Sequence, residues 1–334
     1  METTQNIKLT STELANLWTQ YMNDSMAICV NKYILKNVED KEIRAVCEYA
    51  LGISQNHIQK TKEFLNQDKY PIPYGFTDED VNLEAPRLFS DNFWLMYTHK
   101  MSIHGITGYG IALTTSTRKD VRDYYVQCNN DAMELYNKSN DVLLSKGLFV
   151  RPPYIPTPQQ ATFVEKQDFL TGWFGERRPL NGIEISNIIF NLKKSILRKS
   201  LILGFSQVAK SKQVRQFMTR GADIASKHIE TFSSILHEDE LPSPMSWESD
   251  VTDSTIAPFS DKLMMFHGGV LINAAIAYYG AGMAVCLRRD LAAQYARIIS
   301  ELIKLTEDAA NIMIDNGWME QPPLAVDRKA LARV

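Results

Sequence analysis

Apolar and small residues recur at alternating intervals of four and three along several stretches of the chain, which is the spacing of a helix seam inside a bundle. In the first half, two stripes follow this spacing: Ile43, Cys47, Ala50, Ser54, His57, Thr61 and Phe64, then Val121, Tyr125, Cys128, Ala132, Leu135, Ser139 and Val142. In the second half, the corresponding stripes are Val214, Met218, Gly221, Ala225, His228, Phe232 and Ile235, then Leu291, Tyr295, Ile298, Leu302, Leu305, Ala309 and Ile312. The pattern predicts long amphipathic helices in both halves.

Sequence signals for helix starts accompany these stripes. The runs Thr10–Glu13 and Asn181–Glu184 each place a capping side chain three residues before a glutamate, which is the pattern of a capping box. Asp40 and Ser211 are good N-cap residues just before the second helix of each half. The same start signals therefore occur twice, at corresponding places.

The two halves are copies of one unit. His57-Ile58 aligns with His228-Ile229 at an offset of 171 residues, and Phe89-Ser90-Asp91 aligns with Phe259-Ser260-Asp261 at an offset of 170. One residue lost in a loop accounts for the change of offset. An internal repeat of this kind indicates a duplicated structural unit.

Each copy is expected to hold four helices, so the predicted fold is all-α, with two tandem four-helix bundles. The loop between the second and third helices is long and rich in Pro, Asp and Gly, whereas the other links are short. A long loop can run the length of the bundle and place the third helix parallel to the second, as in ferritin-like bundles. An up-down-up-down bundle, in which the loop folds back, is the alternative.

The expected domains are a first bundle over residues 1–150, a linker over 151–180 and a second bundle over 181–334. The proline-rich run Arg151–Pro158 favours extended structure at the start of the linker. We expect the linker to pack on the bundles through its apolar residues, with a flexible tether as the alternative. These apolar residues are Phe169, Leu170, Trp173 and Phe174.

Composition narrows the function classes. A net charge of −3 argues against a dedicated polyanion-binding protein, so no nucleic-acid partner is expected. The N-terminal residues are polar and lack an apolar signal core, and four scattered cysteines point to a reducing, intracellular setting. Met264–Leu287 is long and uncharged enough to span a membrane. Its counterpart, Met101–Thr117, carries His104 and several hydroxyl residues, so a packed bundle helix explains both and no membrane span is expected.

The sharpest chemical hypothesis is a metal site in the bundle core. His57 and His228 lie on the inward stripes, but the glutamate of a di-iron Glu-x-x-His motif is replaced by Ser54 and Ala225. The candidate metal ligands are His57, Asp131, His104, His228 and Glu301. The competing interpretation is that both histidines are core residues that hydrogen-bond to neighbouring Asn and Asp side chains, and that no cofactor is required.

Other motifs have simpler interpretations. Cys29 and Cys47 are interpreted as small core residues. A basic run in the second copy, from Lys193 to Arg215, is interpreted as a solvated helix face, with contact to an anionic partner as the alternative. The sequence contains no nucleophile-elbow, phosphate-loop, zinc-protease or dinucleotide-binding motif. The chain is therefore not expected to be an enzyme.

Several strings of residues resemble a known family. They are WTQYMNDSMAICV (18–30), RPPYIP (151–156), GWFGERRPLN (172–181), GFSQVAKSK (204–212), PFSDKLMMFH (258–267) and NIMIDNGW (311–318). Together they resemble an uncharacterised family of tandem ferritin-like bundle proteins from spore-forming bacteria, whose members are commonly labelled spore-coat-like. The resemblance spans nearly the whole chain.

The resemblance implies a non-enzymatic structural or interaction protein of spore formers. Its setting would be the cytoplasm or the spore, its partners would include components of the spore coat, and a homo-oligomer is compatible with it. The alternative function is a ferritin-like protein that binds a metal or a small ligand through the layer of His57 and His228.

Overall fold

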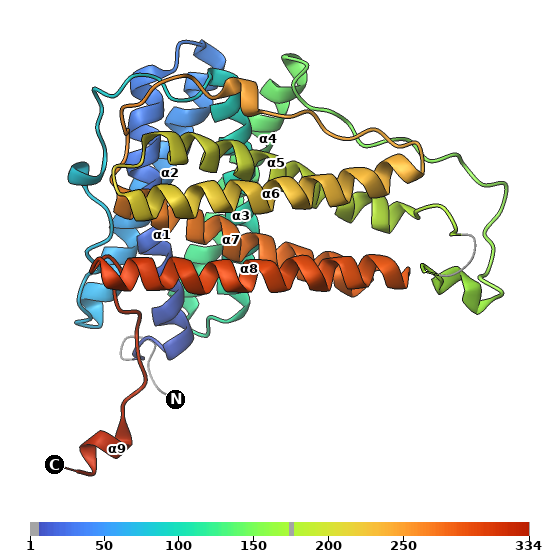
Figure 1. Ribbon diagram of the computed structural model, residues 1–334. Coiled ribbons are helices and arrows are strands. Elements are labelled where there is room, and N and C mark those ends of the chain that lie inside the picture. The colour runs from blue at the N-terminus through green and yellow to red at the C-terminus, as the bar shows by residue number, and fades with distance from the viewer. Residues whose placement is uncertain (1–6, 174–176, 334) are drawn as a thin grey trace.

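The chain folds into two four-helix bundles in a computed structural model that describes residues 7–173 and 177–333 (Figure 1). The first bundle consists of α1 (Ser11–Asn37), α2 (Lys41–Gln67), α3 (Asp91–Thr114) and α4 (Lys119–Ser145). The second consists of α5 (Gly182–Val208), α6 (Lys212–Glu238), α7 (Asp261–Val285) and α8 (Arg289–Asp315). A short helix, α9 (Arg328–Leu331), and three 3₁₀ turns, η1 (Asp78–Asp80), η2 (Gln167–Leu170) and η3 (Glu248–Asp250), complete the helical elements in the described ranges. The prediction of an all-α protein with two helical bundles is confirmed.

The predicted capping boxes form at the starts of α1 and α5, with Thr10 and Asn181 as the capping residues. The glutamate of each box has a further role, because Glu13 also accepts hydrogen bonds from the backbone N–H groups of Thr117 and Arg118, both at 2.7 Å. Burial alone would raise the pKa of Glu13, but these backbone hydrogen bonds outweigh it and lower that pKa to about 2. The box therefore ties the turn between α3 and α4 to the start of α1.

The long crossover loops run the full length of each bundle. The carboxylate of Asp91, at the start of α3, accepts hydrogen bonds from the backbone N–H groups of Glu39 and Asp40, just before α2, at 3.0 and 2.8 Å. Asp261 makes the equivalent bonds to Lys210 and Ser211 in the second bundle. Since the starts of the second and third helices lie together, these helices are parallel. The single long crossover is thus the observed connection, and the up-down-up-down alternative is excluded.

The two crossover loops pair with each other and join the bundles. Val81 forms an antiparallel bridge with Phe259, and Phe89 forms one with Val251. The side chain of Ser260, which caps α7, donates to Asp80 at 2.6 Å, and the side chain of Ser90, which caps α3, donates to Asp250. Each copy therefore supplies a capping serine and an aspartate to the other copy, in a reciprocal arrangement.

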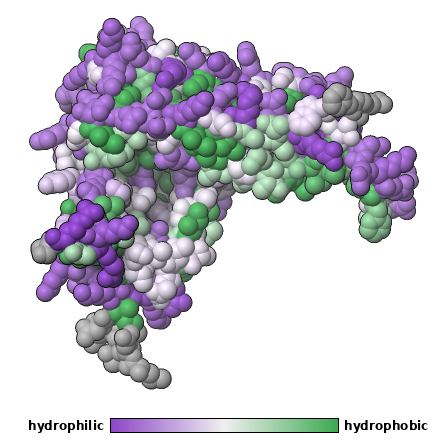
Figure 2. Space-filling view, turned by 60° about the horizontal axis from the view of Figure 1, so that its bottom comes forward, coloured by the Kyte–Doolittle hydropathy of each residue, from purple (hydrophilic) through white to green (hydrophobic). Residues whose placement is uncertain are grey.

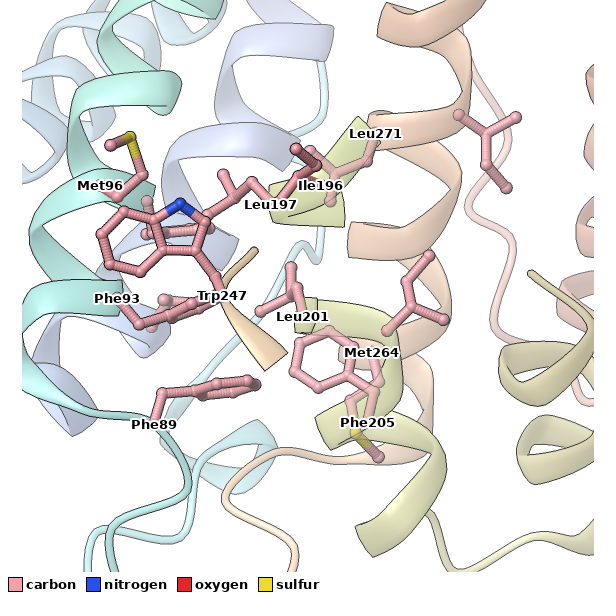
Figure 3. Close-up of a cluster of buried hydrophobic side chains, with 14 of the residues drawn as sticks. Phe89, Phe93, Met96, Ile196, Leu197, Leu201, Phe205, Trp247, Met264 and Leu271 are labelled. Carbon is pink, nitrogen blue, oxygen red and sulfur yellow. The ribbon is translucent and has the colours of Figure 1, made fainter. Parts of the chain in front are cut away.

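Beneath the paired loops, one hydrophobic core continues from the first bundle into the second (Figure 3). Phe89 and Phe93 stack at 4.4 Å between ring centroids, and Phe205 of α5 lies across from them. The other labelled members of this cluster include Met96, Leu197, Leu201, Trp247, Met264 and Leu271. The second bundle lies across the first and projects to one side as an arm (Figure 1). Burial of aromatic and aliphatic side chains at the crossing stabilises the contact between the bundles.

The linker between the bundles is mostly exposed in its described residues. The guanidinium of Arg178 lies 4.0 Å from the ring centroid of Phe169, which with Leu170 is partly buried, whereas Trp173 is 59% exposed. Phe174 lies outside the described residues. The packing of the whole linker on the bundles therefore stays a prediction.

In the part of the chain that the structure describes, one helix, α7, has the length and mean hydropathy that a membrane span requires, and 28% of its apolar window is buried. This helix belongs to the second bundle, where Leu263, Met264 and Ile272 lie in the shared core. Figure 2 shows that hydrophobic surface gathers along the projecting arm, whereas hydrophilic residues cover most of the first bundle. A single helix of this kind is weak evidence for a membrane protein.

Candidate functional site

In the first bundle, His57 of α2 is fully buried and makes two polar contacts. Its Nδ1 lies 3.2 Å from Oδ2 of Asp24 on α1 and 3.3 Å from the hydroxyl oxygen of Tyr109 on α3. Burial alone would lower the pKa of His57, but the charge of Asp24 and the hydrogen bond with it outweigh burial and raise this pKa to about 10. At neutral pH, His57 is therefore protonated and faces Asp24 inside the bundle.

The other side of the His57 ring faces the fourth helix. Cys128 of α4 is 1% exposed, its thiol contributes to the raised pKa of His57, and it accepts a hydrogen bond from Nε2 of Gln20 at 3.7 Å. Within the described residues, Nε2 of His57, Oε1 of Gln20 and the hydroxyl of Tyr125 have no hydrogen-bond partner. Buried polar atoms are nearly always paired, so this group of unpaired atoms calls for an explanation.

A cavity of about 370 Å³ lies beside this polar group, chiefly between α1 and α3. Its polar wall on α1 consists of Asn16, Thr19, Gln20, Asn23, Asp24 and Asn31. The facing wall on α3 is mixed: it contains Met101, Gly105, Gly108, Tyr109 and Ala112, together with the polar side chains of Thr98, Ser102 and the predicted site residue His104. Thr19 and Gly108 are exposed, so the cavity reaches the surface at the middle of the bundle. Its size lies within the range of small-molecule sites.

In the second bundle, His228 has a similar frame but a different acidic partner. Its Nδ1 lies 3.4 Å from the hydroxyl of Tyr279, the counterpart of Tyr109, and its Nε2 lies 3.2 Å from Oε2 of Glu301 on α8. Burial and the positive charge of Arg198 lower the pKa of His228 to about 4, and the opposing effect of Glu301 is smaller. His228 is therefore neutral at pH 7.

The second copy has a cavity at the same place, but it measures only about 20 Å³. Its lining residues Asn191, Ser195, Leu197, Leu271, Ala275 and Tyr279 match Gln20, Asp24, Met26, Met101, Gly105 and Tyr109 of the larger cavity. The difference comes from two cations, because Arg198 replaces Ala27 and Lys194 replaces Asn23. The interpretation of the basic run as a solvated face does not hold for Arg198, which is 3% exposed.

The structure brings only some of the predicted site residues together. His228 and Glu301 are in contact, whereas Asp131 accepts a hydrogen bond from Gln127 at 2.8 Å on the exposed side of α4. His104 lies between the bundles, with its Nδ1 3.5 Å from the hydroxyl of Tyr278. Among the residues that the structure describes, no group of three or more His, Cys, Asp or Glu side chains is arranged to hold a metal ion.

Asp24 and Tyr109 are site residues that the sequence reasoning missed. Tyr109 could have been found, since Tyr109 and Tyr279 match at the offset of 170 that relates the third helices. Asp24 lies one helical turn after Gln20, but Ser195 occupies its position in the second copy. The repeat therefore gave no second example of this carboxylate.

Comparison with known proteins gives a family but no activity. No curated protein matches the chain. Among solved structures, the crystal structure of a "putative spore coat protein" from Bacillus halodurans C-125 is 17% identical, with a TM-score of 0.41. The match covers 46% of this chain and all of that one. The model of the DUF3231 family, described as "Protein of unknown function", matches twice, over residues 1–161 and 168–331. The chain thus belongs to the DUF3231 family and carries two copies of its unit.

Proposed function

We propose that the chain is a binding protein whose first bundle takes up a small polar ligand in the cavity beside Asp24, His57 and Tyr109. The cavity itself carries the proposal, because about 370 Å³ of space reaches from the surface of the first bundle to the buried polar groups around Asp24. An opening of this size needs a reason to persist.

The lining indicates what kind of ligand fits. Oε1 of Gln20 and Oδ1 of Asn23 are buried acceptors without a partner among the described residues, and both belong to the polar wall on α1. A ligand with N–H or O–H groups would satisfy them. The part of the opposite wall formed by Met101 and Gly105 offers an apolar surface for the rest of the molecule. We therefore favour a compact molecule with several donor groups and a short apolar part.

A structural or interaction role in spore formers is a separate proposal, and the spore coat would be its setting. Its support is the sequence resemblance alone. The two proposals are compatible, since a coat component can also bind a small molecule. The cavity favours the binding role, because an inert packing unit gains stability from a filled core.

The test is a ligand screen with a blocked cavity as the comparison. Wild-type protein is heated with free amino acids, polyamines, sugars and nucleosides, and the melting temperature is recorded. In Gly108→Leu, the new side chain extends from a lining position where no heavy atom lies within 4 Å of the added Cβ. Gly52→Leu is the matched control, because Gly52 is an exposed helical position on α2 with equally free space.

We expect one compound class to raise the melting temperature of the wild type and of Gly52→Leu, and to have no effect on Gly108→Leu. A shift on the order of 2–5 °C corresponds to ligand well above its Kd. The proposal fails if every compound leaves the wild type unchanged, or if Gly108→Leu responds as the wild type does.

A further inference from the structure

We propose that the contact between the two bundles contains a binding site for a small monovalent anion, of the size of chloride, formed by Lys100, Lys194 and Arg198. The site is the 20 Å³ cavity between α3 of the first bundle and α5 and α7 of the second. This inference rests on the second copy and on the interface. It does not depend on a ligand in the larger cavity.

Arg198 provides the strongest observation. Its side chain is buried, lines the cavity, and none of its three guanidinium nitrogens has a hydrogen-bond partner among the described residues. A guanidinium stays protonated in proteins and offers five N–H donors. A buried charge without a counterion is strongly unfavourable, so such charges are normally paired. Arg198 therefore lacks the partner that its burial requires.

Two lysines line the same cavity. Lys100 of α3 is 4% exposed, and the buried Nζ of Lys194 has no hydrogen-bond partner in the described part of the chain. The ammonium of Lys194 lies 3.3 Å from the ring centroid of Tyr278, which compensates only part of its charge. Among the described residues, no carboxylate forms an ion pair with either lysine or with Arg198. The cavity thus gathers basic side chains from both bundles, and no Asp or Glu is among its lining residues.

The charges also destabilise one another in the absence of a counterion. Burial lowers the pKa of Lys100 to about 7, with a further contribution from Lys193. Burial and the nearby Lys100 lower the pKa of Lys194 to about 6. An anion in the cavity would favour the charged form of both lysines and neutralise Arg198. The lowered pKa values are what an empty cationic site produces.

The dimensions of the cavity select the occupant. About 20 Å³ of space admits roughly one sphere of the size of a water molecule. Phosphate, a nucleotide or an acidic peptide is too large. The rest of the lining combines apolar and polar side chains: Met101, Leu197, Leu271 and Ala275, with His104, Asn191, Ser195 and Tyr279. A single compact anion beside the basic side chains agrees with this volume.

The experiment compares anions at constant ionic strength. Thermal unfolding of the full chain is measured in sodium gluconate, whose anion is too large to enter, and in mixtures with increasing sodium chloride. The same series is run on Arg198→Met and on Lys194→Met, which remove one cation each from the cavity. Lys199→Met is the matched control, because Lys199 is on the same helix but pairs with Glu248 outside the cavity.

We expect chloride to raise the melting temperature of the wild type and of Lys199→Met by on the order of 3 °C. The shift should be lost in Arg198→Met and reduced in Lys194→Met. In gluconate, Arg198→Met should melt above the wild type, because the uncompensated charge is gone. A crystal grown in bromide should show anomalous scattering at this cavity.

Two results would overturn the inference. One is a wild-type melting temperature that is identical in chloride and gluconate. The other is a chloride shift of equal size in all four proteins, which would be a general salt effect. If Arg198→Met does not fold, the Lys194→Met series and the bromide crystal still decide the question.

Discussion

The two copies present the same histidine in opposite protonation states. His57 and His228 occupy matching positions, and each lies beside the equivalent tyrosine of its own copy. Yet the pKa of His57 is raised to about 10, whereas the pKa of His228 is lowered to about 4. The carboxylate comes from helix one in the first copy, as Asp24, and from helix four in the second copy, as Glu301. Asp24 is buried, whereas Glu301 is partly exposed. Water therefore screens the interaction of Asp24 with His57 less than that of Glu301 with His228.

The comparison shows how a duplicated fold can keep its frame and change its interior chemistry. Few substitutions account for the difference: Asp24 becomes Ser195, and Ala27 becomes Arg198. The first copy keeps an open cavity beside a neutralised ion pair, and the second fills the same space with cations. Two copies of the same backbone fold can therefore differ in the charged groups that their cores contain.

The largest effect is expected from removal of the buried carboxylate in the first copy. Asp24→Ala leaves His57 without its counterion inside the bundle, and loss of one member of a buried ion pair costs about 3–5 kcal/mol. The matching substitution in the second copy, Ser195→Ala, removes only a neutral hydrogen bond to Tyr279 and should cost about 1 kcal/mol. Urea denaturation measures both. Equal costs would show that the two cores are not electrostatically different.

A smaller effect is expected where the copies meet. Gly204 of α5 occupies the position of Tyr33 in the first copy, and an added Cβ would lie 2.4 Å from the ring of Phe89. Phe89 is fully buried and stacked on Phe93, so it has little room to move. Gly204→Ala should therefore destabilise the protein by about 1–3 kcal/mol. Gly269→Ala on α7 has free space and should be neutral or stabilising in the same unfolding experiment. If both variants were destabilised to the same degree, the close approach of α5 to Phe89 would not be the reason for a glycine at position 204.

The smallest effect, taken per pH unit, is expected in the pH dependence of the unfolding free energy, to which the two histidines contribute in different pH ranges. Because the pKa of His57 is raised in the folded state, its stabilisation is complete below about pH 6.5 and is lost as the pH rises towards 10. The slope is at most about 1.4 kcal/mol per pH unit, and His57→Gln should flatten it. His228 has a lowered pKa, so it weakens the fold only as the pH falls from about 6.5 towards 4. Unfolding free energies between pH 4 and 10 test both signs. An unchanged slope above pH 6.5 in His57→Gln would contradict the assignment.

The sequence allowed the helices, their caps, the repeat and the long crossover to be predicted, because these features depend on local spacing and on short-range hydrogen bonds. Asp24 was not predictable, since α1 is buried on several sides and the neighbouring residues Tyr21, Met22 and Ser25 also lie inside. The spacing of apolar residues in α1 therefore does not show which way Asp24 faces. Arg198 escaped prediction for a different reason. A basic residue on a helix normally faces water, and only the position of α3 of the other bundle places it in the interior.

The reciprocal pairing of the crossover loops has a consequence for the history of the chain. Two copies that exchange a serine and an aspartate about a common axis meet as the subunits of an isologous dimer do. In a homodimer of two single units joined by this contact, symmetry would force both pockets to be identical. Fusion into one chain releases that constraint. One pocket can then stay open while the other acquires an arginine, without any change in the surface that joins them.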